Sequence, residues 1–382
     1  MTWPTIALGE VMADRVVGLD TQRFPTELFQ LWSIPAYDEG KPEEVIGSSI
    51  GSPKKVLEPN DVLLSRIVPH IRRAWVVSRA DGLRQVGSGE WIVFRDTRFV
   101  PEYLRHFLLS DSFHAQFMST LAGVGGSLMR ARPTEVARLR TPLPTRAEQR
   151  RIAAILDQAD VVRRKRQKAI TAQDRLIPAK FRSVFLSKTL SEPVPLGELF
   201  NITRGGSPRP IADYLTEAPD GLNWVSISDA TDSGKFIRST KRRIKYSGAE
   251  RSRRVEPGDF LLTNSMSFGR PYIMATTGYI HDGWLSLRPR DDRIDPEYLY
   301  QALNSAQTQA RFAQLAAGAT VKNLNIDLVK SVAIPVPPRA LQDRFAAFVR
   351  KADANIEKTR VHQRHLDSLF ASLQHRAFAG EL

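Results

Sequence analysis

The residues of this chain that are able to do chemistry do not form a recognisable catalytic set. Asp295-Pro296-Glu297-Tyr298 differs at its third residue from the Asp-Pro-Pro-Tyr motif of adenine methyltransferases. Its order suits a helix start, with an aspartate cap and then a proline. The glycine-rich stretch at residues 123–126 lacks the strand, helix and downstream acid of a nucleotide site. His362 and His365 lack a third metal ligand. We therefore expect no catalytic residue, no metal and no cofactor in this chain.

A second group of residues suits the recognition of base pairs. Arginine pairs with guanine, asparagine with adenine, and serine or threonine with either, while further cations contact phosphates and set the register. The candidates lie in polar loops and are Ser65, Arg66, His70, Arg72, Ser127, Arg130, Arg132, Arg204, Ser207, Arg209, Thr263, Asn264, Ser265, Arg270, Thr320, Lys322, Asn323 and Asn325. Arg242, Arg243 and Lys245 form a basic run that is better suited to phosphates. For any one residue, simple surface exposure explains its type as well as a base contact does, so the clusters carry more weight.

The composition agrees with a large polyanionic ligand. The chain has 382 residues, with 55 Lys+Arg against 41 Asp+Glu and a net charge of +14. Such a surplus attracts nucleic acids, although ribosomal and membrane-surface proteins are also basic. The sequence contains no cysteine, which excludes disulfides and thiolate metal sites. Because there is no long apolar run and no basic-then-apolar leader, we expect a soluble cytoplasmic protein without membrane contact.

The chain contains an internal repeat. Pro142-Leu143-Pro144, followed by Gln149, recurs 193 residues later as Pro335-Val336-Pro337, followed by Gln342. Further upstream, Glu58-Pro59-Asn60-Asp61 is matched by Glu256-Pro257-Gly258-Asp259, and Pro101-Glu102-Tyr103-Leu104 by Pro296-Glu297-Tyr298-Leu299. Between these anchors the halves differ. One scaffold with two specificities explains this pattern, and so does ordinary divergence after duplication.

Each half begins with a mixed segment. Short runs rich in Val, Ile, Trp and Phe alternate with Gly, Pro, Ser and Asp clusters, which is typical of short strands and turns. Each segment also contains one expected helix, at about 101–122 and about 296–317, with a proline at its start and a glycine after its end. We predict an α+β fold, with a first globule at residues 1–143, a spacer helix at 144–190, a second globule at 191–336 and a C-terminal spacer helix at 337–382.

The two spacer segments carry apolar residues at helical spacing. Thr145-Arg146-Ala147-Glu148 predicts a capping box at the first start, and Pro178 predicts a kink near the first end. A helix of some forty residues is about 60 Å long. The residues expected to pack are Ile152, Ile155, Leu156, Ala159, Val162, Ile170, Leu176, Phe345, Val349, Ile356, Leu366, Leu369, Phe370 and Leu373. Arg163, Arg164, Lys165, Arg166 and Lys168 lie on the other faces.

Neither helix is able to bury its apolar stripe alone. Two related amphipathic helices most simply pack on each other as an antiparallel coiled coil. Such a pair would act as a spacer between two globules. The basic residues Arg163 to Lys168 would then contact DNA backbone or a partner, or form a solvated helix face.

The repeated halves, the Pro-x-Pro-x-x-x-x-Gln motif before each long helix and the closing residues Ala377-Phe378-Ala379-Gly380-Glu381-Leu382 resemble the specificity subunit of type I restriction-modification systems. Gly205-Gly206-Ser207-Pro208 and the stretch at residues 318–325 add to the resemblance, which covers nearly the whole chain. The first half departs from it, because residues 125–130 replace the usual loop and a glycine-serine-proline element is not evident. The contact residues of the first globule are therefore less well defined.

The resemblance implies that each globule reads one half of a split DNA sequence, while the paired helices fix the unread gap. It also implies that two adenine-N6 methyltransferase subunits dock on the helices, and that restriction or translocase subunits join in some systems. S-adenosylmethionine is expected on the methyltransferase, and ATP and Mg on a restriction subunit. This chain itself is expected to be a non-catalytic DNA-binding subunit.

Two other functions compete with this interpretation. A stand-alone DNA methyltransferase or nuclease is disfavoured by the missing motifs. A coiled-coil scaffold of another DNA-processing complex would make the basic charge incidental. RNA binding is weaker still, since the aromatic residues lie in apolar strand runs rather than at exposed stacking positions.

Overall fold

The structure is a computed structural model that describes residues 3–13, 15–79, 82–122, 129–186, 191–264, 268–317 and 325–382, without the side chain of Ser233. It divides into two compact units, which we describe separately. Unit 1 comprises Met1–Lys168 and Arg360–Leu382, and unit 2 comprises Ala169–Thr359. The two longest helices, α5 (Arg146–Asp174) and α13 (Arg339–Ala379), each contribute residues to both units.

The first globule, within unit 1, contains two sheets of mainly antiparallel strands. The larger has the order β2-β5-β8-β3-β4, with β3 and β8 parallel, and the smaller has the order β7-β6-β9. β1 pairs with β12, and β10 with β11. The strands are β1 (Thr5–Ala7), β2 (Gly18–Leu19), β3 (Leu28–Trp32), β4 (Glu43–Ile46), β5 (Lys54–Val56), β6 (Val62–Ser65), β7 (Ala74–Val76), β8 (Arg84–Gly87), β9 (Trp91–Phe94), β10 (Leu121–Ala122), β11 (Arg130–Ala131) and β12 (Arg140–Pro142).

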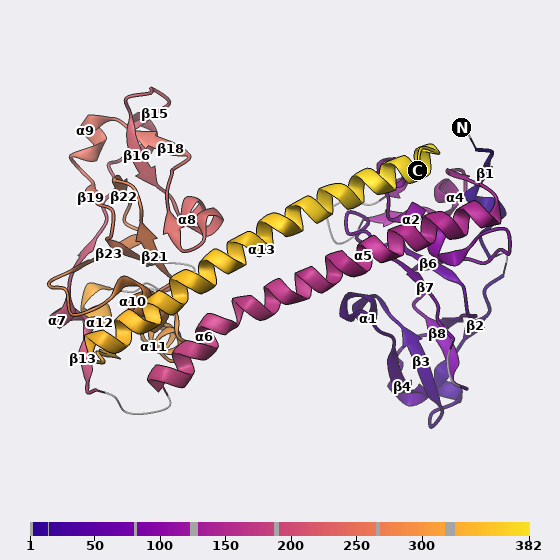
Figure 1. The fold of residues 1–382 in the computed structure, drawn as a ribbon, viewed down its shortest axis with the longest axis horizontal. Coiled ribbons are helices and arrows are strands. Elements are labelled where there is room, and N and C mark those ends of the chain that lie inside the picture. Colours follow the sequence, from indigo (N-terminus) through magenta and orange to yellow (C-terminus); the bar gives the residue numbers. More distant parts are fainter. Residues whose placement is uncertain are drawn as a thin grey trace. The chain divides into compact units, whose positions relative to one another are not determined.

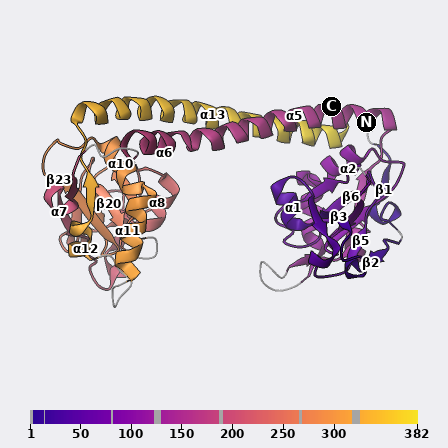
Figure 2. The ribbon, with the colours of Figure 1, turned by 90° about the horizontal axis from the view of Figure 1, so that it is seen from below.

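Short helices cover the smaller sheet of this globule. α2 packs against β6 and β7, as both views show within unit 1 (Figures 1 and 2). The helices are α1 (Ile34–Glu39), α2 (Pro101–Leu108), α3 (Asp111–Phe117) and α4 (Pro133–Val136), with 3-10 turns at Leu8–Glu10, Thr21–Arg23, Gly47–Ser49 and Met118–Thr120. Their buried faces, together with β6 and β9, form one core that includes Tyr103, Phe107 and Phe113.

The second globule, within unit 2, repeats this plan. One sheet has the order β15-β18-β16-β22-β19, with β16 and β22 parallel, and the other has the order β14-β23-β20-β21-β17. β13 pairs with β24. The strands are β13 (Pro193–Pro195), β14 (Phe200–Arg204), β15 (Leu215–Thr216), β16 (Leu222–Val225), β17 (Phe236–Ile237), β18 (Arg242–Ile244), β19 (Arg253–Val255), β20 (Phe260–Thr263), β21 (Pro271–Met274), β22 (Gly278–Ile280), β23 (Trp284–Pro289) and β24 (Ala333–Pro335).

The helices of unit 2 cover the sheet that contains β20 and β21, and α10 packs against β21. They are α6 (Leu176–Phe181), the π-helical turn Arg182–Leu186, α7 (Leu196–Leu199), α8 (Ile227–Ser233), α9 (Tyr246–Ala249), α10 (Pro296–Asn304), α11 (Ala306–Ala317) and α12 (Ile326–Ser331), with a 3-10 turn at Ile211–Asp213. The α+β prediction is therefore confirmed, with two sheet-rich globules and two long helices.

The prediction of one long helix in each globule is wrong, because a serine divides each segment. α2 ends at Leu108, and the Ser110 hydroxyl accepts a hydrogen bond from Phe113 N at 3.2 Å to start α3. Likewise, Ser305 separates α10 from α11, and its hydroxyl accepts from Thr308 N at 3.3 Å. A serine hydroxyl that satisfies a free amide favours a new helix start over helix continuation. The proline starts themselves are confirmed at Pro101 and Pro296.

The two globules share their topology. The order β5-β8-β3-β4 in the first corresponds to β19-β22-β16-β18 in the second, with the parallel pair in the middle of each. A buried tryptophan makes the same hydrogen bond in both: Trp91 Nε1 donates to Trp32 O at 2.7 Å, and Trp284 Nε1 donates to Val225 O at 3.1 Å. The repeat seen in the sequence is therefore also a repeat of the fold, because the two globules have the same internal topology.

The repeated proline motif connects each globule to its long helix through a buried glutamine. Gln149 Oε1 accepts from Val100 N at 2.7 Å, while its Nε2 donates to Arg98 O and Pro144 O, both at 3.0 Å. The Gln149 side chain is fully buried, so these hydrogen bonds satisfy backbone groups that water does not reach.

Gln342 makes the same connection in unit 2. Its Oε1 accepts from Asp295 N at 2.8 Å, and its Nε2 donates to Pro337 O at 2.8 Å and Arg293 O at 3.1 Å. In both units the amide therefore joins the start of a long helix to the start of a globule helix, α2 in unit 1 and α10 in unit 2. This arrangement fixes the long helix against its own globule.

In unit 1 the start of α5 runs antiparallel to the end of α13. Arg151 Nη2 donates to Leu382 O at 2.5 Å, and three turns later Arg163 Nε lies 2.8 Å from Asp367 Oδ1. The Arg163 guanidinium also lies over the Phe370 ring, 4.4 Å from its centroid. Ile152 and Leu156 are buried in the same core as Ala377. Arg163 therefore has a structural role and is not part of a free basic face.

In unit 2 the segment after α5 packs against the first half of α13. Phe181 and Phe185 contact the Phe345 ring at 5.7 and 5.2 Å between centroids, and Val349 and Ile356 lie in the same core. These two phenylalanines follow a break in the helix, because α5 ends at Asp174 and α6 begins at Leu176. The break lies just before Pro178, near which the sequence predicted a kink. Proline has no amide hydrogen, so it cannot continue the ladder of the preceding helix.

Several details of the helix predictions need correction. The Thr145 hydroxyl accepts from Glu148 N at 3.3 Å, but the Glu148 carboxylate binds Arg151 at 2.8 Å rather than closing the predicted capping box. Among the residues predicted to pack, three are exposed: Val162 at 47%, Leu176 at 49% and Leu369 at 55%. The remaining predicted packing residues are buried or partly buried: Ile152, Ile155, Leu156, Ala159, Ile170, Phe345, Val349, Ile356, Leu366, Phe370 and Leu373.

Each globule also contacts its long helices through charged side chains, and these differ between the units. In unit 1, Asp157 Oδ1 on α5 lies 2.8 Å from the buried His106 Nε2 and 2.7 Å from Arg105 Nη2. In unit 2, Lys235 pairs with Glu297 on α10 and lies 3.7 Å from Asp353 on α13. A similar helix contact is thus built from a histidine in one unit and a lysine in the other.

Candidate nucleic-acid interface

In the first globule, Glu90 gathers the arginines predicted to contact DNA. Arg66, directly after β6, places its Nε 2.8 Å from Glu90 Oε2, and Arg130, at the start of β11, places its Nη2 3.5 Å from Oε1. Ala131 N donates to Arg66 O at 2.8 Å, which holds the two loops together. One carboxylate shared by two guanidinium groups leaves a net positive charge with free donors. We call Glu90, Arg66 and Arg130 the first cluster.

In the second globule, Asp282 plays the corresponding part with other side chains. Ser207 Oγ donates to Asp282 Oδ1 at 2.8 Å, and Arg209 Nη2 lies 3.7 Å from Oδ2. The backbone oxygen of Asp282 accepts from Arg204 Nε at 2.9 Å and from Asn264 Nδ2 at 3.1 Å. We call these five residues the second cluster. The Ser207 hydroxyl is the main cause that lowers the pKa of the Asp282 carboxyl, so this group stays ionised.

The glycines of Gly205-Gly206 are needed for this geometry. A Cβ atom at residue 205 would lie 2.0 Å from His281 O, and one at residue 206 would lie 3.0 Å from Arg251 O. The two amides donate to Trp284 O at 3.0 Å and Ile280 O at 3.1 Å. The motif thus brings Ser207 against Asp282 by close packing of backbone on backbone.

The two clusters occupy equivalent places in the fold. Arg66 N donates to Glu90 O at 3.0 Å, and Asn264 N donates to Gly283 O at 2.9 Å, next to Asp282. Both donors directly follow equivalent strands, β6 and β20. One globule therefore presents an arginine where the other presents an asparagine. The Asn264 side chain is 1% exposed, and its Oδ1 has no hydrogen-bond partner within the described part of the chain.

Other residues predicted to contact bases are buried, and their side chains form hydrogen bonds within the globule. Ser65 is 2% exposed and its hydroxyl donates to Ile67 O at 3.1 Å, while Thr263 is 1% exposed and its hydroxyl accepts from Arg270 N at 3.1 Å. These hydroxyls shape the loops. Asn325 is exposed, but its Oδ1 accepts from Leu328 N at 2.7 Å as the cap of α12.

The remaining predicted residues are placed singly. His70, Arg132 and Arg270 are exposed, and the Arg270 guanidinium lies 5.7 Å from the centroid of the Tyr272 ring. Arg72 is tied to Asp111 at 2.5 Å and to Leu109 O at 3.2 Å. Ser127, Ser265, Thr320, Lys322 and Asn323 lie outside the described residues.

The predicted phosphate-binding run is only partly available. Arg243 donates to Ala218 O and Pro219 O, and Lys245 donates to Asp213 O at 2.7 Å. These contacts hold β18 and its end against the segments on either side of β15, so both side chains have a structural role that the sequence did not reveal. Arg242 is exposed on β18.

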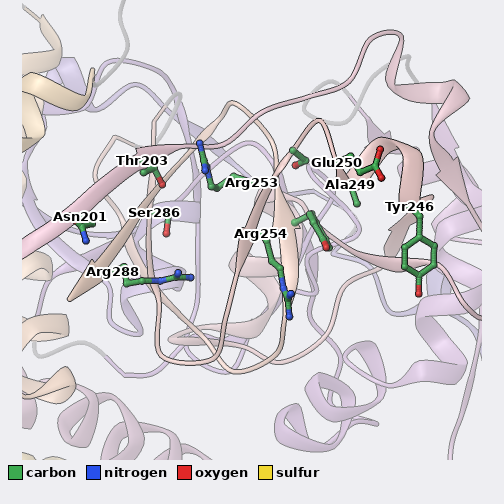
Figure 3. A pocket seen from close by; sticks show the side chains of 11 residues that line it. Asn201, Thr203, Tyr246, Ala249, Glu250, Arg253, Arg254, Ser286 and Arg288 are labelled. Carbon is green, nitrogen blue, oxygen red and sulfur yellow. The ribbon is translucent and has the colours of Figure 1, made fainter. Parts of the chain in front are cut away.

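The second globule also contains a polar pocket of about 470 Å³, most of whose residues were not predicted from the sequence. Figure 3 shows Asn201, Thr203, Arg253, Arg254 and Ser286 around it, with further walls from the other labelled residues. The alternation of exposed and buried residues along β14 was the signal available for Asn201 and Thr203. Arg253 and Arg254 precede a buried valine on β19, a short pattern that does not stand out in a chain rich in arginine.

No helix among the described residues is long and apolar enough to cross a membrane. The described residues also contain no group of three potential ligands able to hold a metal ion. The side chains brought together are arginine, asparagine, serine and threonine on two twisted sheets. These groups suit hydrogen bonding to base edges and phosphates.

Comparison with known proteins gives a family match. Residues 189–363 match the model of the "Type I restriction modification DNA specificity domain". The matched segment, which contains the second globule, is therefore similar to the family whose resemblance the sequence suggested.

Solved structures show the same fold over the full chain. A chain from a study of complex assembly and conformational transition of the type I R-M system is 23% identical, with a TM-score of 0.63, covering 100% of this chain and 98% of that one. The S subunit of a type I restriction-modification system from M. genitalium is 14% identical, with a TM-score of 0.58, covering 99% of this chain and 96% of that one. At these identities the likeness concerns the fold alone.

Proposed function

We propose that this chain reads a two-part DNA target, one half with each globule. The observation that carries the proposal is the contrast between a repeated frame and unequal clusters. Both globules hold their long helix through a buried glutamine, whereas Arg66 of the first cluster is replaced by Asn264 in the second. Clusters of such different composition present different donors and acceptors to base edges, so equivalent loops would select different bases.

We propose further that α5 and α13 dock two adenine-N6 methyltransferase subunits and set the unread gap. Their exposed apolar residues Val162, Leu176 and Leu369 support a partner surface on the helices. The partners would supply S-adenosylmethionine, and a restriction subunit, where present, would supply ATP and Mg. The complex would act on double-stranded DNA in the cytoplasm, with the target adenine turned out of the duplex by the methyltransferase.

The test of two-part reading is a map of methylated adenines in cells that carry the methyltransferase with wild-type or variant chain. Asp282→Asn removes the charge that organises the second cluster, and Glu90→Gln does the same in the first. We expect each variant to relax base preference in one half of a split motif and leave the other half intact. The proposal would be contradicted if every motif stayed methylated after the gene for this chain is deleted. It would also be contradicted if each variant altered both halves of the motif together.

The spacer role has a separate test. Seven residues inserted after Lys168 and seven after Thr359 lengthen both helices by about 10 Å, which corresponds to about three base pairs. The two insertions are made together, at the boundaries between the compact units, so that both long helices gain two turns. We expect the unread gap of the methylated motif to grow while both halves remain the same. An unchanged gap in a methylating complex would remove the spacer role.

A further inference from the structure

Lys55 and Arg253 occupy the same position in the two globules. Each lies three residues before the Glu-Pro turn, in which Glu58 N or Glu256 N donates to an aspartate at 2.8 Å. Their strand partners are also equivalent. Lys55 pairs with Gly87, four residues before Trp91, and Arg253 pairs with Ile280, four residues before Trp284. Both globules therefore have a cation at this position, although the first and second clusters nearby differ in their residues.

Both cations lie beside the clusters. Lys55 Nζ donates to Trp91 O at 2.6 Å, directly after Glu90 in the chain, and two ammonium hydrogens remain for another acceptor. Arg253 lies opposite Ile280, two residues before Asp282. Other cations that recur in both globules belong to the frame: Arg95 and Arg288 each grip a buried aspartate with two hydrogen bonds.

The pocket around Arg253 has the chemistry of a phosphate site (Figure 3). Thr203, Ser286 and Asn201 add neutral hydrogen-bond donors to its wall. Two other arginines of the pocket are already paired, Arg254 with Glu256 at 2.9 Å and Arg288 with Asp259 at 2.6 Å. The Arg253 side chain is exposed, and the described residues offer it no ion pair or hydrogen bond. It is the cation of this pocket that is available to a ligand.

We propose that Lys55 and Arg253 each bind a phosphate of the DNA backbone next to the half-site that their globule reads. The two half-sites differ in bases but share the phosphodiester backbone, so a contact common to both globules fits the common part of the ligand. This inference rests on the proposed reading of DNA by both globules. Burial also lowers the pKa of the Lys55 ammonium by removing its hydration, and a phosphate would replace that hydration.

The experiment measures duplex binding by the complex of this chain with its methyltransferase subunits at several salt concentrations. Lys55→Ala and Arg253→Ala are each expected to make the slope of log K against log[salt] less negative by about one. The loss of affinity should be similar for a duplex that contains the motif and for one that lacks it. Lys55→Arg and Arg253→Lys should retain the wild-type slope, which separates loss of charge from misfolding.

Arg138→Ala is the control, because it removes one cation from the turn after α4, where the side chain is 75% exposed and paired with Glu135. The inference is overturned if Lys55→Ala and Arg253→Ala change the slope no more than Arg138→Ala does. It is also overturned if either variant changes the methylated motif, since that would make the residue a base reader. A wild-type complex without motif-specific binding would instead contradict the proposed function.

Discussion

In the first globule one carboxylate, Glu90, holds two arginines, whereas in the second Asp282 organises a serine, an asparagine and two arginines. Around these clusters the frames agree in their topology and in the buried glutamine and tryptophan. The comparison shows that the two globules share a frame and differ in the clusters that this frame carries. The frame is constrained by buried backbone groups that must be paired, while the loops are constrained by the ligand.

The largest expected difference concerns a repeated phenylalanine. Phe185 is buried against Tyr298 at 4.8 Å, whereas its repeat partner Phe378 is only partly buried beside Tyr103 at 5.5 Å. Phe185→Ala should lower the free energy of unfolding by about 3–5 kcal/mol, because it leaves a large cavity, and Phe378→Ala should lower it by less. Urea unfolding followed by tryptophan fluorescence measures both. Equal losses would show that the two units bury this position alike.

The glutamines should instead behave alike. Gln149→Leu and Gln342→Leu each leave one amide and two carbonyls without their partner, at a cost of about 2–4 kcal/mol in unfolding free energy. Gln158→Leu, at an exposed position of α5, is the control and should change stability by about 0.5 kcal/mol or less. If the two variants lost widely different amounts of unfolding free energy, the two glutamines would not have equivalent roles.

The charged contacts predict a pH difference between the units. Burial lowers the pKa of His106, and attraction by Asp157 and Asp160 does not offset burial and the neighbouring Arg105. The folded state therefore resists a proton that the unfolded chain accepts near pH 6.5. The stability from neutral His106 is complete above that pH and is lost as the pH falls through it.

The wild-type urea midpoint should accordingly fall more between pH 7.5 and 5.5 than that of His106→Gln. Lys235→Gln changes the corresponding contact in unit 2 and leaves His106 in place, so it should retain the wild-type pH response. The same pH response in wild type and His106→Gln would show that the imidazole is not the group responsible.

The smallest expected effect distinguishes exposed from packed residues on α13. Leu369 is 55% exposed, so Leu369→Ser should change the free energy of unfolding by about 0.5 kcal/mol or less. Leu373, which packs against the core of unit 1, should lose about 1–2 kcal/mol in the same substitution. Thermal unfolding of the two variants side by side measures the difference. A larger loss for Leu369→Ser would place that side chain in the core after all.

The α+β fold, the repeat and the two long helices could be predicted from the sequence because they depend on local patterns. The function of Gln149 could not, since its partner Val100 lies 49 residues away. The breaks at Ser110 and Ser305 were missed because the apolar pattern continues across them, while a single hydroxyl decides the local structure. Glu90 and Asp282 were missed for a different reason: they stand at adjacent, not identical, positions of the repeat.

The division of α13 between the units has a consequence for synthesis on the ribosome. Unit 1 combines Met1–Lys168 with Arg360–Leu382, whereas unit 2 is continuous in sequence. Domains generally fold as their residues emerge, so unit 2 is complete while unit 1 still lacks its last segment. Until then the apolar surface later covered by Ala377 and Phe378 stays open to solvent. The half that is translated first is thus the half that finishes folding last, and it is the one most in need of protection from aggregation.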